Sequence, residues 1–142
     1  MLLHLGVNAQ GTGFKMEECA YNEASFGIPD EQGYQPRNVP VLLLDGQPVG
    51  TRCDTTLNVE ALVQHQTAAF PNVKTQTSTD PGRFVCNYLY CYSLNKLQTL
   101  SSPKVQCLFL HIPSFEVIPK EVQIEYILVL MRQLVQDCTL SP

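Results

Sequence analysis

Short apolar runs alternate with longer segments of helical periodicity along the chain. Residues 2–7 form an apolar run, and residues 14–22 and 73–77 have the composition of further extended segments. The most hydrophobic of these segments, residues 105–112, is ended by Pro113. We therefore expect a strand in each of these four segments, with Glu17 inside the second and His111 at the carboxyl end of the fourth.

Three segments predict helices. The first begins after Asp54 or Thr55, either of which is expected to cap it, and ends at Pro71. The second covers residues 85–97, and the third covers residues 119–138. Apolar residues recur at helical spacing in the third segment: Ile124, Ile127, Leu128, Met131, Leu134, Val135 and Cys138.

The alternation of strands with amphipathic helices predicts an α/β fold with helices on both faces of a sheet. In such sheets, ligands bind beyond the carboxyl ends of the strands. Asp45-Gly46 is a hairpin-turn signal within residues 41–52. With 142 residues, of which 44% are hydrophobic, we expect residues 1–142 to form a single domain.

Charge and composition exclude several classes of partner. The formal net charge is -4, and the nine Lys and Arg residues are scattered along the chain, so we expect no binding to nucleic acid or to an anionic membrane surface. No apolar run approaches the roughly 20 residues that cross a bilayer, and the first residues lack the features of a secretory signal. We expect a cytosolic protein. Because the chain opens directly inside a core strand, we also expect it to be incomplete at the N-terminus.

Metal and cofactor sites are not expected. The sequence has no CxxC pair, and its three histidines, His4, His65 and His111, are far apart. With no secretory signal, most thiols are expected to be reduced and buried as small apolar side chains. The six cysteines are Cys19, Cys53, Cys86, Cys91, Cys107 and Cys138.

Cys86 is the cysteine best placed for nucleophilic catalysis. It follows a glycine-containing turn and stands near a helix start, where free N–H groups favour a thiolate and can bind an oxyanion. His111, at the end of the next strand, would lie alongside it. From the residues alone, however, a cysteine in an apolar stretch is more often a core thiol than a nucleophile. His111 could equally be a core or strand-end histidine without a chemical role. Glu17 is more unusual, since a carboxylate in a partly buried strand needs a partner.

The surroundings of these three residues resemble pyroglutamyl-peptidase I. Residues 82–94 (GRFVCNYLYCYSL) are similar to its nucleophile motif, in which a glycine and an aromatic residue precede Cys-Asn and a helix. Residues 109–113 (FLHIP) resemble its histidine motif. Similarity to its glutamate region covers residues 4–7 (HLGV), 16–17 (ME), 22 (N), 28–30 (IPD) and 35–36 (QP). The three blocks follow the order of the family and span nearly the whole chain.

This resemblance implies a three-layer open mixed sheet that lacks the first strand and helix of the family. It also implies a cysteine-type peptidase, without a cofactor, that hydrolyses the bond after an N-terminal pyroglutamyl residue. Cys86 would be the nucleophile, His111 the general base and then acid, and Glu17 the carboxylate that orients the imidazole. Phe84 matches an aromatic residue that packs against the lactam ring of the substrate. Substrates would be N-terminally pyroglutamylated peptides.

The chain also departs from the family. Full-length members begin with a further stretch whose aromatic residues clamp the pyroglutamyl ring, and bacterial members often have an arginine where this chain has Gly27. Two alternatives to an active peptidase therefore stay open: a catalytically inactive relative with a binding or regulatory role, and a small α/β domain in which Cys86 is structural. A sheet edge left open by a missing strand would also favour homo-oligomers.

Overall fold

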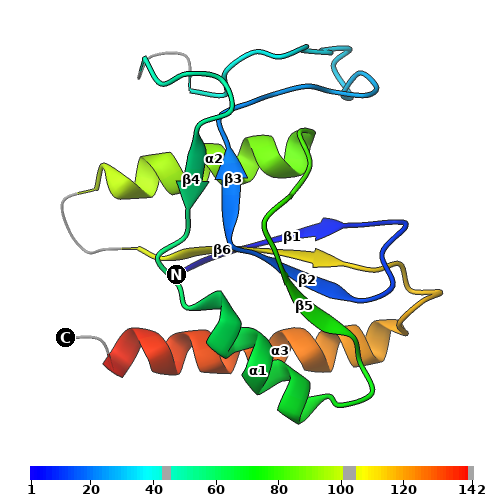
Figure 1. Cartoon of the computed structure of the whole chain (residues 1–142). Helices are drawn as coiled ribbons and strands as arrows, with labels where there is room; N and C mark the ends of the chain where they lie inside the picture. Colours follow the sequence, from blue (N-terminus) through cyan, green and yellow to red (C-terminus); the bar gives the residue numbers. More distant parts are fainter. Residues whose placement is uncertain (43–45, 101–104, 141–142) are drawn as a thin grey trace.

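The computed structural model describes residues 1–42, 46–100 and 105–140. Its main sheet has four strands in the order β1-β6-β2-β5 (Figure 1). β1 pairs with β6 in parallel, β6 with β2 in antiparallel, and β2 with β5 in parallel, so the sheet is mixed. The strand bounds are Leu2–Val7 (β1), Phe14–Glu17 (β2), Thr75–Ser78 (β5) and Cys107–Ile112 (β6).

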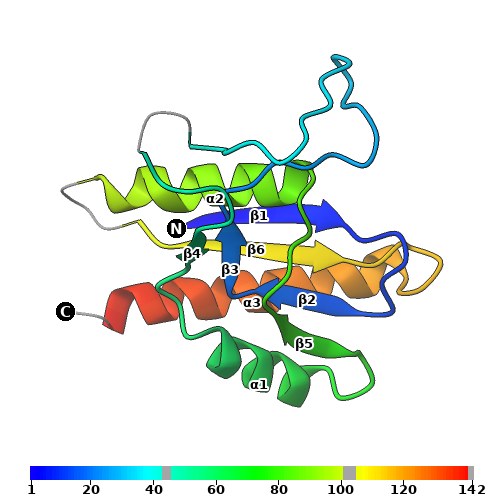
Figure 2. The ribbon, with the colours of Figure 1, turned by 45° about the horizontal axis from the view of Figure 1, so that its top comes forward.

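Helices cover both faces of this sheet. α2 (Val85–Gln98) lies on one face, and α1 (Val59–Ala69) and α3 (Lys120–Leu140) lie on the other (Figure 2). The sequence prediction of three layers around a mixed sheet is therefore confirmed. On the α1 and α3 side, Phe14 stacks on Tyr126 with ring centroids 3.7 Å apart, and Leu108 and Leu110 are fully buried.

The second predicted strand was wrong as a single element. Residues 14–22 divide into β2 and β3 (Cys19–Tyr21), and β3 leaves the main sheet to pair in antiparallel with β4 (Arg52–Asp54). The break lies at Glu18, whose N–H donates to the Ser78 carbonyl at 2.8 Å and whose carbonyl accepts from the Thr55 N–H at 3.0 Å. These partners are 60 and 37 residues away in the sequence, so no local sequence pattern predicts the break.

The predicted cap of the first helix was also wrong. Asn58 caps α1, and its side-chain oxygen accepts from the Ala61 N–H at 3.1 Å. Thr55 is used elsewhere, because its hydroxyl donates to the Cys107 carbonyl at 2.6 Å and so ties this loop to β6. The predicted Asp45-Gly46 turn includes residue 45, which lies outside the described residues.

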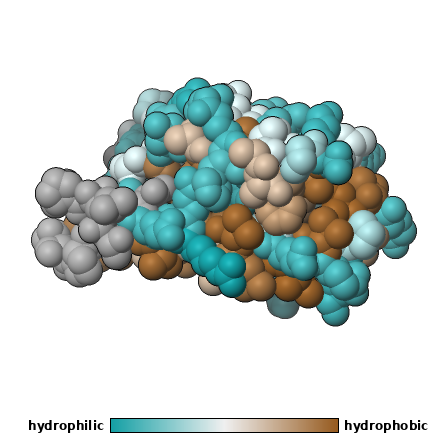
Figure 3. Space-filling view, turned by 90° about the horizontal axis from the view of Figure 1, so that it is seen from below, coloured by the Kyte–Doolittle hydropathy of each residue, from teal (hydrophilic) through white to brown (hydrophobic). Residues whose placement is uncertain are grey.

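The surface carries a large apolar area. Figure 3, seen from below Figure 1, shows apolar residues gathered on the side of the molecule where α1 and α3 lie. Exposed apolar residues of α3 include Ile124, Leu128, Met131 and Val135. Across the described parts of the chain, no helix is both long and apolar enough to cross a membrane.

Candidate functional site

Glu17, His111 and Cys86 come from three elements that meet on the α2 side of the sheet. Glu17 is the last residue of β2, His111 is the next to last residue of β6, and Cys86 is the second residue of α2. Side chains alternate between the two faces of a strand, and His111 is the register partner of Lys15 while Glu17 is the partner of Phe109. Glu17 and His111 therefore share the face that α2 covers.

The closest contact of the site is between His111 and Glu17. The ring Nδ1 of His111 lies 2.8 Å from Glu17 Oε1, and both residues are buried. Glu17 Oε2 has no hydrogen-bond partner among the described residues. A buried carboxylate held through one oxygen fixes the ring orientation of its histidine and leaves Nε2 free to face another group.

The pKa of His111 departs strongly from its ordinary value. Burial alone lowers the pKa of His111, because desolvation disfavours the imidazolium. Hydrogen bonding to the Cys86 and Glu17 side chains, together with the charge on Glu17, outweighs burial and raises the pKa of His111 to about 9 from 6.5. The imidazolium form is thus favoured at neutral pH. A protonated imidazole beside a cysteine stabilises the thiolate.

Cys86 lies at the positive end of a helix dipole. Phe84 is the N-cap of α2 in an extended conformation and makes no side-chain capping bond. The first N–H groups of the helix, including that of Cys86, are therefore free of a side-chain cap and can donate to an anion. Cys86 is partly exposed, in contrast to the fully buried Cys91 one and a half turns later.

Gly6 makes room for the thiol. A Cβ built on Gly6 would lie 3.0 Å from Cys86 Sγ and 2.7 Å from the Phe109 ring. Gly6 is the register partner of His111 on β1, so the thiol lies above β1 and beside the imidazole. In the sequence, Gly6 belongs to the HLGV segment that resembles the family, but no role was predicted for it. The signal for that role is a glycine interrupting an apolar strand, which often marks a close approach.

Asn87 fixes the start of α2 against β3. Its side-chain oxygen accepts from the Tyr21 N–H at 2.7 Å, and its side-chain nitrogen donates to the carbonyls of Tyr21 and Glu23 at 2.9 and 2.8 Å. Arg83 adds an ion pair with Glu23 at 3.2 Å. Three bonds from one buried amide hold the residue next to Cys86, so the thiol is carried on a rigid support.

Phe84 belongs to an aromatic cluster beside the thiol. Its ring meets that of Phe26 edge-on at 4.7 Å, and Phe26 also contacts Tyr34 and Tyr88. Phe84 is partly exposed, so part of its ring remains available to a ligand. Phe26 was not predicted, because it lies in a loop that carries no periodic pattern.

The other residues weighed from the sequence do not join this site. His4 lies 2.9 Å through Nε2 from the Ser93 hydroxyl, and burial lowers the pKa of His4, which keeps it neutral at pH 7. His65 is exposed on α1. Cys91 and Cys53 form a buried pair of thiols with sulfurs 3.8 Å apart. Among the described residues, no group of three or more His, Cys, Asp or Glu side chains could hold a metal ion.

Comparison with known sequences links the chain to a peptidase family. The sequence model of the family described as pyroglutamyl peptidase matches residues 1–128. The pyrrolidone-carboxylate peptidase of Levilactobacillus brevis is 31% identical over 115 residues, which cover 80% of this chain and 52% of that protein. The enzyme of the same name from Escherichia fergusonii is 33% identical over 115 residues, covering 80% and 49%. The chain therefore spans about half the length of these relatives.

Solved structures share the fold. A mutant pyrrolidone carboxyl peptidase from the hyperthermophile Pyrococcus furiosus matches with a TM-score of 0.78 at 21% identity, covering 96% of this chain and 69% of that one. The pyrrolidone carboxyl peptidase of Fervidobacterium islandicum AW-1 gives the same TM-score at 23% identity, covering 94% and 68%. At these identities the likeness concerns the arrangement of sheet and helices.

Proposed function

Because the chain belongs to the pyroglutamyl peptidase family, we propose that it is a cysteine peptidase that removes an N-terminal pyroglutamyl residue from peptides. The observation that carries this proposal is the bond between His111 and Glu17 at 2.8 Å, with the Cys86 thiol above Gly6, the register partner of His111. A thiol, an imidazole and an orienting carboxylate are the groups that acyl transfer to cysteine requires.

In the proposed first step, the Cys86 thiolate attacks the pyroglutamyl carbonyl carbon. The negative charge moves to the carbonyl oxygen, which the backbone N–H of Cys86 at the start of α2 stabilises. His111, as the imidazolium, gives its proton to the nitrogen of the departing peptide as the carbon–nitrogen bond breaks. The products are a thioester on Cys86 and a peptide with a free amino terminus.

The second step returns the free enzyme. A water molecule attacks the thioester, and neutral His111 takes its proton. The carbon–sulfur bond then breaks, which releases pyroglutamic acid and restores the Cys86 thiolate beside protonated His111. Throughout the cycle, Glu17 holds Nδ1 of His111 and stabilises the charged ring.

We further propose that Phe84 packs against the lactam ring. The ring of Phe84 is fixed by its edge-on contact with Phe26, and it stands two residues before Cys86. A rigid apolar surface beside the nucleophile suits a flat, uncharged five-membered lactam. The cytosolic location and the formation of a homo-oligomer through an open sheet edge stay predictions. Within the described residues, β1 has a sheet neighbour, β6, on one side only.

Hydrolysis of a fluorogenic pyroglutamyl amide tests the proposal. We expect turnover by the wild-type chain and its loss to background in Cys86→Ser. The matched control is Cys91→Ser, which removes a buried thiol from the same helix without touching the site, and it is expected to keep wild-type turnover. Activity that survives Cys86→Ser would exclude this nucleophile. A folded wild-type chain without turnover would instead support an inactive relative of the family.

A further inference from the structure

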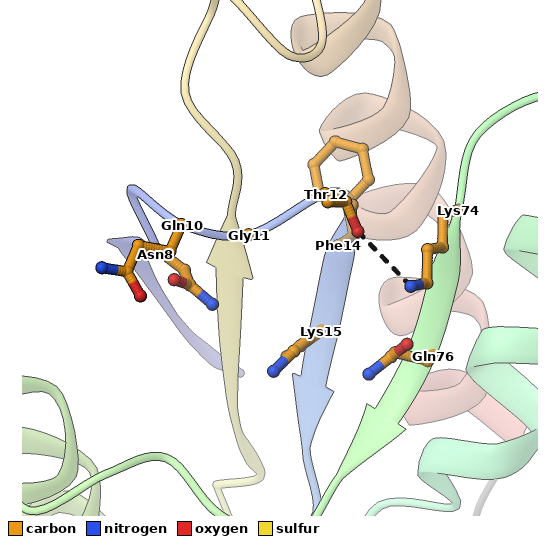
Figure 4. A pocket seen from close by; sticks show the side chains of 9 residues that line it. Asn8, Gln10, Gly11, Thr12, Phe14, Lys15, Lys74 and Gln76 are labelled. Atoms are coloured by element: carbon orange, nitrogen blue, oxygen red, sulfur yellow. Dashed lines mark hydrogen bonds between the residues drawn. The ribbon is translucent and has the colours of Figure 1, made fainter.

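A polar hollow of about 350 Å³ lies at the end of the sheet where β1 and β6 finish and β2 begins (Figure 4). The loop after β1 forms one side, and the starts of β2 and β5 form the other. The polar side chains that line it are Asn8, Gln10, Thr12, Lys15, Lys74 and Gln76.

The hollow adjoins the candidate active site through the register of the strands. Gly6 on β1, His111 on β6, Lys15 on β2 and Gln76 on β5 are successive register partners, so they form one row across the sheet. Register partners point to the same face. Lys15 and Gln76 therefore extend the row of His111 beyond the imidazole, on the face that carries Cys86.

The polar groups of the hollow are available to a ligand. Among the described residues, the side chains of Asn8, Gln10, Lys15 and Gln76 make no hydrogen bond, and Lys15 forms no ion pair. The ammonium of Lys74 donates to the Thr12 hydroxyl at 3.3 Å, which directs it to the same side (Figure 4).

The hollow is also positively charged. Its lining includes two lysines and no Asp or Glu. Glu17 shares the face of Lys15, but its Oε1 is bound to His111. Ammonium groups and amide N–H groups that converge on an empty space are the donors that bind carboxylates.

Close backbone packing holds the hollow in shape. A Cβ built on Gly13 would lie 2.3 Å from the Lys74 carbonyl, so only glycine lets this loop approach β5 so closely. The Phe14 N–H donates to the same carbonyl at 2.9 Å. The two lysines are therefore carried on paired backbone rather than on a free loop.

We propose that this hollow binds a carboxylate of the peptide on the leaving side of the scissile bond, so that the preferred substrates have an acidic group on the residue after pyroglutamate. The inference rests on the proposed function. His111 must reach the departing nitrogen to give it a proton, so the first residue of the leaving peptide lies beside the imidazole. Lys15 is one strand away, about 5 Å, a gap that its own long side chain and a carboxylate side chain of the substrate can span together.

Two pairs of dipeptides test this inference. Pyroglutamyl-aspartyl amide and pyroglutamyl-asparaginyl amide have the same size and differ in one charge. Pyroglutamyl-alanine and its amide differ only in the terminal carboxylate, so the two pairs separate a side-chain source of the charge from a main-chain one. The measurement is kcat/KM of each peptide for the wild type, Lys15→Gln, Lys74→Gln and the control Lys96→Gln. Lys96 lies near the far end of α2, over the Tyr92 ring.

We expect the wild type to prefer the charged member of at least one pair by about tenfold, the effect of one charge-assisted contact. Lys15→Gln should bring that ratio close to one by lowering kcat/KM of the charged peptide. Lys74→Gln should reduce the ratio partly, and Lys96→Gln should keep it. Equal rates within both pairs, or a preference that survives Lys15→Gln, would overturn the inference.

Binding distinguishes failure of this inference from failure of the proposed function. Calorimetry of the Cys86→Ser variant measures the affinity of the aspartyl and asparaginyl amides without turnover. If wild-type protein hydrolyses none of the four peptides, the proposed function is wrong. If the two amides also bind with equal affinity, the inference that the hollow binds a carboxylate is wrong as well. Tighter binding of the aspartyl amide that depends on Lys15 would support the carboxylate site even in a protein without turnover.

Discussion

Leu110 and His111 are consecutive residues of β6 that point to opposite faces of the sheet. Leu110 lies on the α1 and α3 face, among apolar residues such as Met16 and Leu130 that are fully buried. His111 lies on the α2 face, bound to Glu17 and in contact with Cys86. The same strand thus contributes a core residue and a chemical group at adjacent positions.

The buried polar groups on the two faces of the sheet differ in charge. On the α1 and α3 side, Gln66 donates to the Tyr126 carbonyl at 3.1 Å, and Gln123 donates to the carbonyls of Ile118 and Pro113 at 2.8 and 3.0 Å. These neutral amides join the helices to their neighbours. On the α2 side, the buried polar groups include the Asn22 and Asn87 amides and also a charge, the Glu17 carboxylate paired with His111. One face is therefore organised for stability, whereas the other keeps a costly charge that serves the imidazole.

Replacing His111 is expected to have the largest effect and to separate the two faces most clearly. His111→Gln removes the proposed general base and acid, so kcat/KM should fall by about 10³-fold or more, or about 4 kcal/mol in transition-state stabilisation. The free energy of unfolding should fall by about 1–3 kcal/mol at neutral pH, because the buried Glu17 carboxylate loses its cationic partner. Kinetics with a pyroglutamyl amide and urea unfolding measure the two quantities. A variant that retains most of its activity would mean that His111 has no catalytic role.

Replacing the neighbouring Leu110 should have the opposite profile. Leu110→Ala leaves a cavity between the sheet and α3, which is expected to lower the free energy of unfolding by about 2–5 kcal/mol. In native buffer, the folded protein should keep kcat/KM within about threefold of wild type, because Leu110 does not face the site. A large loss of activity in protein shown by circular dichroism to be folded would mean that the two faces are coupled.

The parts of the fold that could be predicted are those with a local cause. β6 was recognised as a continuous apolar run ended by a proline, and α3 because apolar residues recur at helical spacing over several turns. The division of residues 14–22 into two strands could not be predicted, since it depends on bonds from Glu18 to Ser78 and Thr55, which the sequence does not link. The cap of α1 was missed because Thr55 and Asn58 are both good capping residues, and tertiary contact with Cys107 selects between them.

For the site, the sequence supplied its chemical groups but not their surroundings. Cys86, His111 and Glu17 could be named because they lie in motifs that resemble a family, while periodicity alone left Cys86 as one thiol among six. No role was predicted for Lys15, since a lone lysine in a strand is usually a solvated side chain. Its position beside His111 follows from the antiparallel register of β2 and β6, which is a long-range property of the fold.

The pH dependence of stability should report the contact on the α2 face. The pKa of His111 is raised from 6.5 to about 9 in the folded chain, against the lowering effect of burial, by Cys86 and Glu17. The folded state therefore binds the proton more tightly than the unfolded state, and this stabilisation is full below about pH 6.5 and is lost as pH rises through about 9. We expect wild type to lose about 1–3 kcal/mol more than His111→Gln between pH 6 and pH 9.5.

Urea unfolding of both proteins across this range provides the measurement. The difference between them cancels the titration of buried thiols such as Cys107, whose pKa burial raises to about 12. Glu17→Gln should flatten the wild-type slope, because the neutral amide stabilises the imidazolium less. A slope that is the same in wild type and His111→Gln would show that His111 is not preferentially protonated in the folded state.

Gly6→Ala is expected to have the smallest effect, and it tests how tightly the thiol and the sheet are packed. The new methyl group would lie 2.7 Å from the Phe109 ring and 3.0 Å from Cys86 Sγ, so the ring or the thiol must move. We expect a loss of about 1 kcal/mol in the free energy of unfolding and about a tenfold fall in kcat/KM, since small displacements of a nucleophile slow the reaction. Gly27→Ala is the matched control, because nothing lies within 4 Å of a Cβ there. If both variants behave as wild type in urea unfolding and in kinetics, the α2 face of the sheet accommodates an added methyl group without a loss of stability. The close approach of β1 to Cys86 is then not needed for catalysis.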